Sequence, residues 1–256
     1  NENSETVIVT MGTPTNGTQG ATITHTATIT DDDLPPTVNW ISVSQASVNE
    51  SGTMSVMAQL STASGLDVTV LFTVGGTAMN PADYTMTASP ITIFAGGTTG
   101  TATITIAVDG LDELNETVIV TMGTPTNGTV GTTTVHTATI TDDDLPPTVN
   151  WTSALQASAN ESGTMSVTAQ LSAVSGLDVT VPFTVSGTAT SADYTVTASP
   201  ITILAGGTTG TATITIAVDA LDELNETVIV TMGTPTNGTP GTTTVHTATI
   251  TDDDLP

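Results

Sequence analysis

The stretch "TATITDDDLPPTVNW", residues 137–151, joins the end of one alternating segment to the start of another. Threonine and apolar residues alternate up to Thr141, three adjacent aspartates follow, and two prolines precede a new apolar segment. Alternation with a period of two predicts a β-strand with one buried face and one solvated face. Prolines stiffen a connection and cannot continue regular pairing. The stretch therefore predicts a boundary between two β-domains, with carboxylates concentrated at that boundary.

The boundary recurs because the chain is an array of repeats. Residues 82–146 return at 192–256 with four changes, at Met86, Phe94, Gly110 and Val130. The preceding parts, 37–81 and 148–191, match more loosely but share "NESGTMSV" and "SGLDVTV". We therefore predict a back half of a repeat at 1–35, comprising its last two strands, and complete repeats at 36–146 and 147–256. An isolated strand pair is barely stable, so residues 1–35 require a front half, either from a longer array or from another subunit.

Each complete repeat contains seven alternating segments. In the first repeat we place strands near 38–48, 53–61, 67–74, 90–94, 101–108, 117–123 and 132–141. Threonine makes up about a quarter of the 256 residues, and this β-branched polar residue suits the wet face of a sheet. Seven short strands in about 110 residues are typical of an immunoglobulin-like sandwich. The predicted fold is all-β, with tandem immunoglobulin-like sandwiches joined by short proline-containing linkers.

Composition excludes several classes of function. The chain has 25 acidic residues, no Lys, no Arg and no Cys. Without basic side chains we expect neither nucleic-acid binding nor attraction to anionic lipid. No apolar run is long enough to predict membrane insertion in this segment. The serines and acids form no nucleophile–base set, so we do not expect an enzyme.

The acids of a repeat are predicted to gather at one end of the sandwich. Successive strands run up and down, so the first, third and fifth loops and the end of the last strand lie at the same pole. Those segments carry nine carboxylates in the first repeat, and only Asp67 falls at the other end. With no basic side chain to neutralise them, such carboxylates must hold protons or a cation. Carboxylate oxygens suit Ca²⁺ better than Mg²⁺; the alternative is that "DDD" is a solvated turn.

The same motifs resemble the Calx-beta domain family along the whole chain. The matching segments are "VNESG" at 48–52, "GTAMNPADY" at 76–84, "AVDGLDELNETVIV" at 107–120 and "TITDDD" at 139–144. The resemblance implies a seven-stranded immunoglobulin-like sandwich whose loops bind Ca²⁺. The metal ligands it implies are Glu50, Asp83, Asp109, Glu113, Asp142, Asp143 and Asp144 in the first repeat, and Glu161, Asp193, Asp219, Glu223, Asp252, Asp253 and Asp254 in the second.

These features favour a structural repeat protein, namely a stalk, an adhesin shaft or a filament subunit made rigid by Ca²⁺. We expect it to be extracellular or at the cell surface, with neighbouring repeats or copies of itself as partners. One alternative is a glycan-binding or cell-binding adhesion module, for which Trp40 and Trp151 are candidate stacking residues. The other alternative is a Ca²⁺-sensing regulatory domain, as in exchangers.

Overall fold

The computed structural model describes residues 1–255, apart from the side chains of Ala46 and Ser47. Every regular element in this range is a β-strand, as the alternation predicts. No helix long and apolar enough to cross a membrane occurs among these residues. Two compact units are present: Asn1–Val108 with Asn115–Thr141, and Asp109–Leu114 with Asp142–Pro256. The loop 109–114 of the first repeat thus belongs structurally to the second unit.

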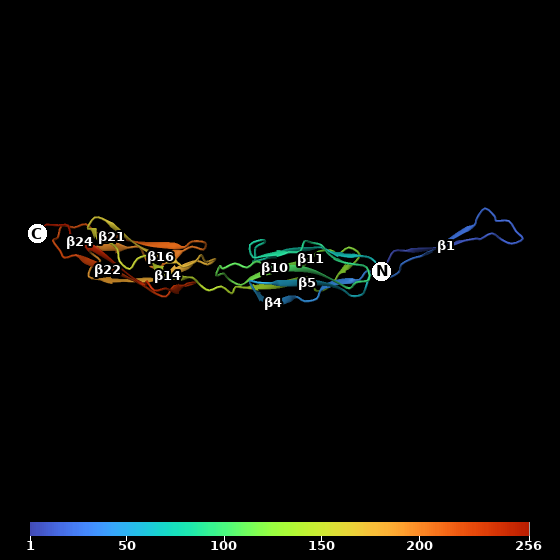
Figure 1. Ribbon diagram of the computed structural model, residues 1–256, viewed down its shortest axis with the longest axis horizontal. Helices are drawn as coiled ribbons and strands as arrows, with labels where there is room; N and C mark the ends of the chain where they lie inside the picture. The colour runs from blue at the N-terminus through green and yellow to red at the C-terminus, as the bar shows by residue number, and fades with distance from the viewer. Residues whose placement is uncertain (256) are drawn as a thin grey trace. The chain divides into compact units, whose positions relative to one another are not determined.

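The first unit contains a hairpin and the sandwich of the first repeat (Figure 1). The hairpin is β1 (Glu5–Thr10) with β2 (Thr24–Ile29). One sheet of the sandwich has the order β12-β3-β5-β10-β8, the other has the order β4-β13-β11-β7, and β6 pairs with β9. The strands are β3 (Thr37–Trp40), β4 (Ser44–Asn49), β5 (Thr53–Leu60), β6 (Val68–Val70), β7 (Phe72–Gly76), β8 (Tyr84–Met86), β9 (Ile91–Ile93), β10 (Thr99–Ile106), β11 (Glu116–Met122), β12 (Thr129–Val130) and β13 (Val135–Thr141).

The second unit repeats this topology. Its sheets have the orders β19-β21-β16-β14-β23 and β15-β24-β22-β18, with β17 paired to β20. The strands are β14 (Thr148–Trp151), β15 (Ala159–Asn160), β16 (Thr164–Leu171), β17 (Val179–Val181), β18 (Phe183–Gly187), β19 (Tyr194–Val196), β20 (Ile201–Ile203), β21 (Thr209–Ile216), β22 (Glu226–Met232), β23 (Thr239–Pro240) and β24 (Val245–Thr251). Both repeats are immunoglobulin-like sandwiches.

The core of each sandwich is built from the alternating apolar residues. In β10 the side chains of Ala102, Ile104 and Ile106 are buried, and the intervening threonines face outward or lie half-buried. In β11, Val118 and Val120 are fully buried in the same way. Burial of aliphatic side chains contributes about 1.5–3 kcal/mol each. The alternation of buried and outward-facing residues predicted for these segments is therefore confirmed within β10 and β11.

Two segments that were predicted to be single strands are each two strands, so these two predictions are wrong. The segment 38–48 is two strands, because β3 pairs with β5 in one sheet whereas β4 pairs in parallel with β13 in the other. The segment 67–74 is likewise divided into β6 and β7, around the exposed Leu71. In the first case the chain passes from one sheet of the sandwich to the other, and in the second it passes from the pair β6–β9 to the sheet that contains β7. The strand β8, which pairs with β10, was not among the predicted seven.

A Ser-Gly turn makes the same backbone contact in both units. In the first unit Gly65 N donates to the carbonyl oxygen of Asn1, at 2.8 Å. In the second unit Gly176 N donates to the carbonyl oxygen of Asp112, at 3.0 Å. Ser64 and Ser175, which precede the two glycines, are 2% and 1% exposed. Asn1 and Asp112 hold equivalent positions, each five residues before the Thr-Val-Ile-Val of the following strand.

Candidate metal centre

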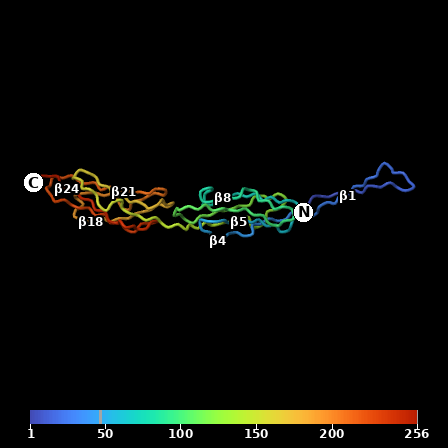
Figure 2. The backbone as a smooth tube through the Cα atoms, in the orientation of Figure 1, coloured from blue at the N-terminus to red at the C-terminus, as the bar shows by residue number. Residues whose placement is uncertain are grey.

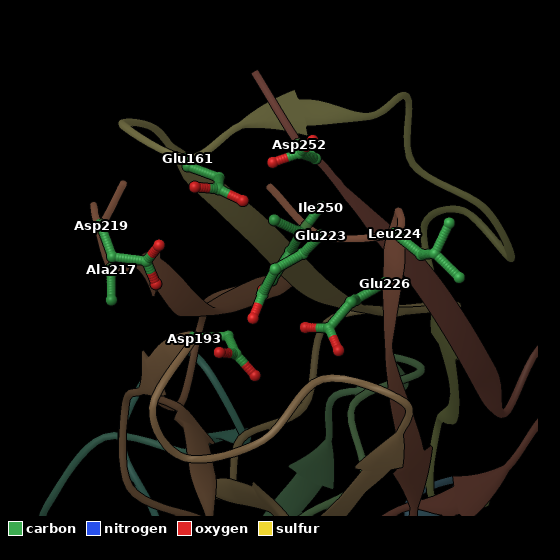
Figure 3. Close-up of a pocket in the computed structure, with 9 residues that line it drawn as sticks. All are labelled: Glu161, Asp193, Ala217, Asp219, Glu223, Leu224, Glu226, Ile250 and Asp252. Atoms are coloured by element: carbon green, nitrogen blue, oxygen red, sulfur yellow. The ribbon is translucent and has the colours of Figure 1, made fainter. Parts of the chain in front are cut away.

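The loop end of the second repeat gathers six acidic side chains around one small cavity. Figure 3 shows their carboxylates directed toward a common space. The cavity measures about 10 Å³, which is the size that one water molecule requires. Its lining consists of Glu161, Asp193, Ala217, Asp219, Glu223, Leu224, Glu226, Ile250 and Asp252.

One carboxylate trio follows directly from strand pairing. Strands β15 and β24 run parallel, with Asn160 opposite Thr251. The residues that come next, Glu161 and Asp252, therefore leave the sheet side by side. Oxygens of Glu161, Asp252 and Asp254 lie within 4.8 Å of one another. This trio is defined here as the first acidic set.

The second acidic set consists of Asp193, Asp219 and Glu223, whose oxygens also lie within 4.8 Å of one another. Asp193 comes just before β19, and the other two residues lie in the loop between β21 and β22. The backbone N of Ala217 donates to Asp193 O at 2.7 Å, which holds the two loops together. The Asp193 carboxylate is itself oriented by Thr190, whose Oγ1 donates to Asp193 Oδ2 at 2.8 Å.

Two oxygens of the first acidic set are buried without a hydrogen-bond donor. Glu161 is only 8% exposed. Within residues 1–255, neither Glu161 Oε2 nor Asp252 Oδ1 has a hydrogen-bond partner, and both atoms are inaccessible to solvent. A buried carboxylate oxygen without a partner is strongly unfavourable. A bound cation would remove that penalty, so the donor set fits an oxygen-ligated metal ion.

The pKa values of these carboxyl groups reflect their burial and the negative charges of their neighbours. Burial, followed by the charges of Asp219 and Asp252, raises the pKa of Glu161 above its ordinary 4.5. Burial, followed by the charges of Asp219 and Asp193, raises the pKa of Glu223. The pKa of Asp193 is lowered instead, chiefly by the hydrogen bond from the backbone of Thr190. Glu161 and Glu223 therefore hold their protons more tightly in the folded state than in an unfolded chain.

In the absence of divalent metal, we expect the melting temperature of this repeat to fall as the pH rises above about 4.5. The unfolded chain loses its glutamate protons near that pH, whereas Glu161 and Glu223 in the folded state retain theirs to a higher pH. Stability decreases with pH wherever the folded state binds more protons. Calorimetry between pH 4 and pH 7.5 with a chelator present tests this, and Glu161→Gln should flatten the slope. A melting temperature that rose over this range would contradict the prediction.

The structure brings most of the implied ligands of the second repeat together. Six of the seven, all except Asp253, belong to one of the two acidic sets. Asp253 instead accepts a hydrogen bond from Asn160 Nδ2, at 3.2 Å. Glu226 was not among the implied ligands, yet it lines the cavity and shares a hydrogen bond with Asp193. The sequence already offers Glu116 and Glu226 as further candidate ligands outside the implied set, with a structural role as the alternative.

The implied ligands of the first repeat belong to both compact units. Glu50 and Asp83 lie in the first unit. Asp83 Oδ2 accepts a hydrogen bond from Met79 N, much as Asp193 does from Thr190. The second unit contains the remaining ligands, Asp109, Glu113, Asp142, Asp143 and Asp144.

Within the second unit the loop 109–114 is held by specific contacts. Asp112 is 7% exposed, and Ser175 Oγ donates to its Oδ2 at 3.3 Å. Glu113 N donates to Asp142 Oδ1 at 3.2 Å. The side chain of Glu113 lies against Gly176, where a Cβ would approach Glu113 Cγ to 2.6 Å. A side chain at position 176 would therefore displace the Glu113 side chain from its present place.

The two tryptophans, and Asp178 at the other end of the second repeat, have structural roles. Trp40 and Trp151 are 1% and 2% exposed, and each indole N–H donates to a backbone carbonyl, of Thr134 and Thr244 respectively, at 2.9 Å. Neither ring is exposed for stacking on a glycan. Asp178 Oδ1 accepts a hydrogen bond from Ala205 N at 2.8 Å, which braces a loop.

The chain belongs to the Calx-beta domain family. The family model named "Calx-beta domain" matches residues 31–144 and 148–254. Calx-beta domains are binding modules, and the match indicates no enzymatic family. A comparison with curated proteins found no match.

Two of the solved structures that match this chain are the following. "Crystal structure of CBD12 from CALX1.2" is 16% identical over 84% of this chain and 99% of that chain, with a TM-score of 0.40. "Crystal structure of calcium binding domain CBD12 of CALX1.1" is 14% identical over 82% of this chain and 98% of that chain, with a TM-score of 0.40. The assignment to the family rests on the family model.

Proposed function

We propose that this chain is a calcium-binding structural repeat protein that forms part of an extracellular stalk, an adhesin shaft or a filament. The observation that carries the proposal is the pair of acidic sets at the loop end of the second repeat. Six carboxylates from four separate segments meet there in a chain that has no Lys and no Arg. Such a site is neutralised by protons or by a cation, and a divalent cation would also satisfy the buried oxygens of Glu161 and Asp252.

Calcium fits the donor set better than other biological metals do. All the candidate ligands are carboxylate oxygens, which are hard donors, and the chain has no thiolate for a softer metal. The first acidic set would hold one ion and the second acidic set another. The bound Ca²⁺ supplies positive charge, while the residues supply a fixed arrangement of oxygens from strand ends. Loss of the ion would leave the loops with unbalanced negative charge.

A structural role follows from where these loops occur in the sequence. Two of the triple aspartates, 31–33 and 142–144, are each followed by one leucine and two prolines. The prolines are Pro35 and Pro36 in the first case and Pro146 and Pro147 in the second. The next strand begins immediately afterwards. A cation held by these aspartates would therefore restrain the linker to the following repeat. The chain has no disulfide, because it has no cysteine, so a metal is the stiffening device that its composition allows.

Small-angle X-ray scattering of the 256-residue chain with Ca²⁺ and with EGTA tests this function. We expect the calcium form to give one well-defined maximum dimension and the chelated form to give a broader distance distribution. The reason is that chelation releases the loops that precede the proline linker. A Glu50→Gln/Asp144→Asn variant should resemble the chelated form at all calcium concentrations. Identical distance distributions in both conditions would overturn the proposed stiffening, even if calcium binds.

A further inference from the structure

The hairpin β1–β2 presents an apolar face that no other described strand covers. The side chains of Val7, Val9 and Met11 are 48%, 59% and 52% exposed. In the complete first repeat their equivalents are Val118, Val120 and Met122, at 0%, 0% and 7%. Figure 2 shows the hairpin in blue as two strands without a further neighbour, which agrees with its two-stranded sheet.

The hairpin already has the conformation of the last two long strands of a repeat. Glu5 pairs with Ile29 and Val9 with His25. In the complete repeat Glu116 pairs with Ile140 and Val120 with His136, so the register is the same. The connecting turn also matches, because Asn16 has φ 59° and the equivalent Asn127 has φ 56°. The exposed face is therefore preformed for the cover that the equivalent strands receive.

The complete repeat identifies that cover. There β11 pairs with β7, and β13 pairs with β4. The buried faces of β11 and β13 share one hydrophobic core with strands that include β5 and β10. His136 makes a specific polar contact from the same face, since its Nδ1 lies 2.9 Å from Ser42 O. The covering strands β4, β5, β7 and β10, together with Ser42, all come from residues 36–108, the front half of the repeat.

We propose that the apolar face of β1–β2 is a binding site for the front half of another Calx-beta repeat, of the same type as residues 36–108. Strands equivalent to β4 and β7 would pair with the two edges of the hairpin, and the equivalents of β5 and β10 would cover Val7 and Val9. The same front half would bring the equivalent of Glu161 toward Asp31–Asp33, as Glu161 meets Asp252 and Asp254 in the second repeat. The hairpin thus completes both a sandwich and an acidic site with strands from a separate stretch of polypeptide.

Hydrogen–deuterium exchange on a three-repeat fusion tests the proposal. A copy of residues 36–111 is placed directly before Asn1, in the register that precedes Asp112 in the natural repeat. We expect protection of the β1 and β2 amides to increase on the order of 100-fold or more relative to the 256-residue chain, because exchange then requires opening of a whole repeat. Val7→Asp/Val9→Asp in the fusion should abolish this gain. Thr10→Asp is the matched control, because the equivalent Thr121 faces solvent.

Three results would overturn the proposal. The hairpin could exchange equally fast in the fusion and in the 256-residue chain. The gain could survive the double aspartate substitution. The hairpin of the unmodified chain could already be protected, with the chain sedimenting as a dimer, which would identify a second copy as the occupant. None of these outcomes depends on calcium, so the proposal can fail independently of the proposed function.

Discussion

The double substitution Glu161→Gln/Asp252→Asn is expected to stabilise the second repeat in the absence of calcium and to reduce its stabilisation by calcium. Without metal, the variant should melt at a higher temperature than the unmodified chain, because two mutually repelling buried carboxylates are gone. With calcium bound, the variant should melt at a lower temperature than the unmodified chain. A ligand at 100 times its dissociation constant stabilises the folded state by about 2.7 kcal/mol, and the variant loses the share of that gain that belongs to the first acidic set.

Calorimetric titration and melting curves on the same samples provide the measurement. The amount of calcium bound by the variant should be lower by the share of the first acidic set. The second acidic set should continue to bind calcium. Asp178→Asn is the matched control, since it removes one charge from the same repeat but keeps an oxygen that can accept from Ala205 N. Its calcium uptake should equal that of the unmodified chain. Uptake by the double variant equal to that of the control would show that Glu161 and Asp252 are not ligands.

The substitution Gly76→Ala is expected to unfold the first repeat or to lower its melting temperature by roughly 10–20 °C. Gly76 has φ 120°, and a Cβ at this position would lie 2.0 Å from Thr117 O. The obstructing atom is backbone of β11, which pairs with β7 at this residue and cannot move without breaking the sheet. Backbone strain and overpacking together make a loss of about 3 kcal/mol or more the expected effect.

The neighbouring residue provides the control for that substitution. A Cβ at Gly75 meets nothing within 4 Å, and the second repeat has Ser186 at the equivalent position. Gly75→Ser should therefore leave the melting temperature within about 2 °C, which corresponds to less than 0.5 kcal/mol. The two variants differ by one position in the same strand, so circular dichroism melts compare them directly. A similar decrease in both would show that steric obstruction at Gly76 is not the cause.

The buried faces of the strands could be predicted because alternation is a local property. His136, Ala138 and Ile140 are all buried, as the period of two predicts. The alternation in 101–108 predicts that Val108 shares the buried face of Ile106, but Val108 is 71% exposed, because β10 ends at Ile106 and the acidic loop begins. The division of 67–74 could not be predicted, since Val70, Leu71 and Phe72 continue the alternation through the point where the chain changes sheets.

The candidate site was predictable as a region but not as a coordination set. Loop alternation places Glu161, Asp193, Asp219 and Asp252 at one end of the sandwich, and the structure brings them together. Loop alternation alone does not determine which oxygen each residue presents to the site. Of three adjacent aspartates, Asp252 and Asp254 join the first acidic set, whereas Asp253 accepts from Asn160. Side-chain direction at a strand end depends on contacts with other segments, which a local pattern does not encode.

The Ser-Gly turn recognises a main-chain carbonyl, so it does not discriminate among the residues that offer one. Asn1 and Asp112 present the same atom to Gly65 and Gly176 although their side chains differ. The main-chain part of this contact sets no requirement on the side chain at that position, so the same hydrogen bond can form where the repeats carry different residues. The near-identity of 82–146 and 192–256 is what recent copying of a module would leave behind.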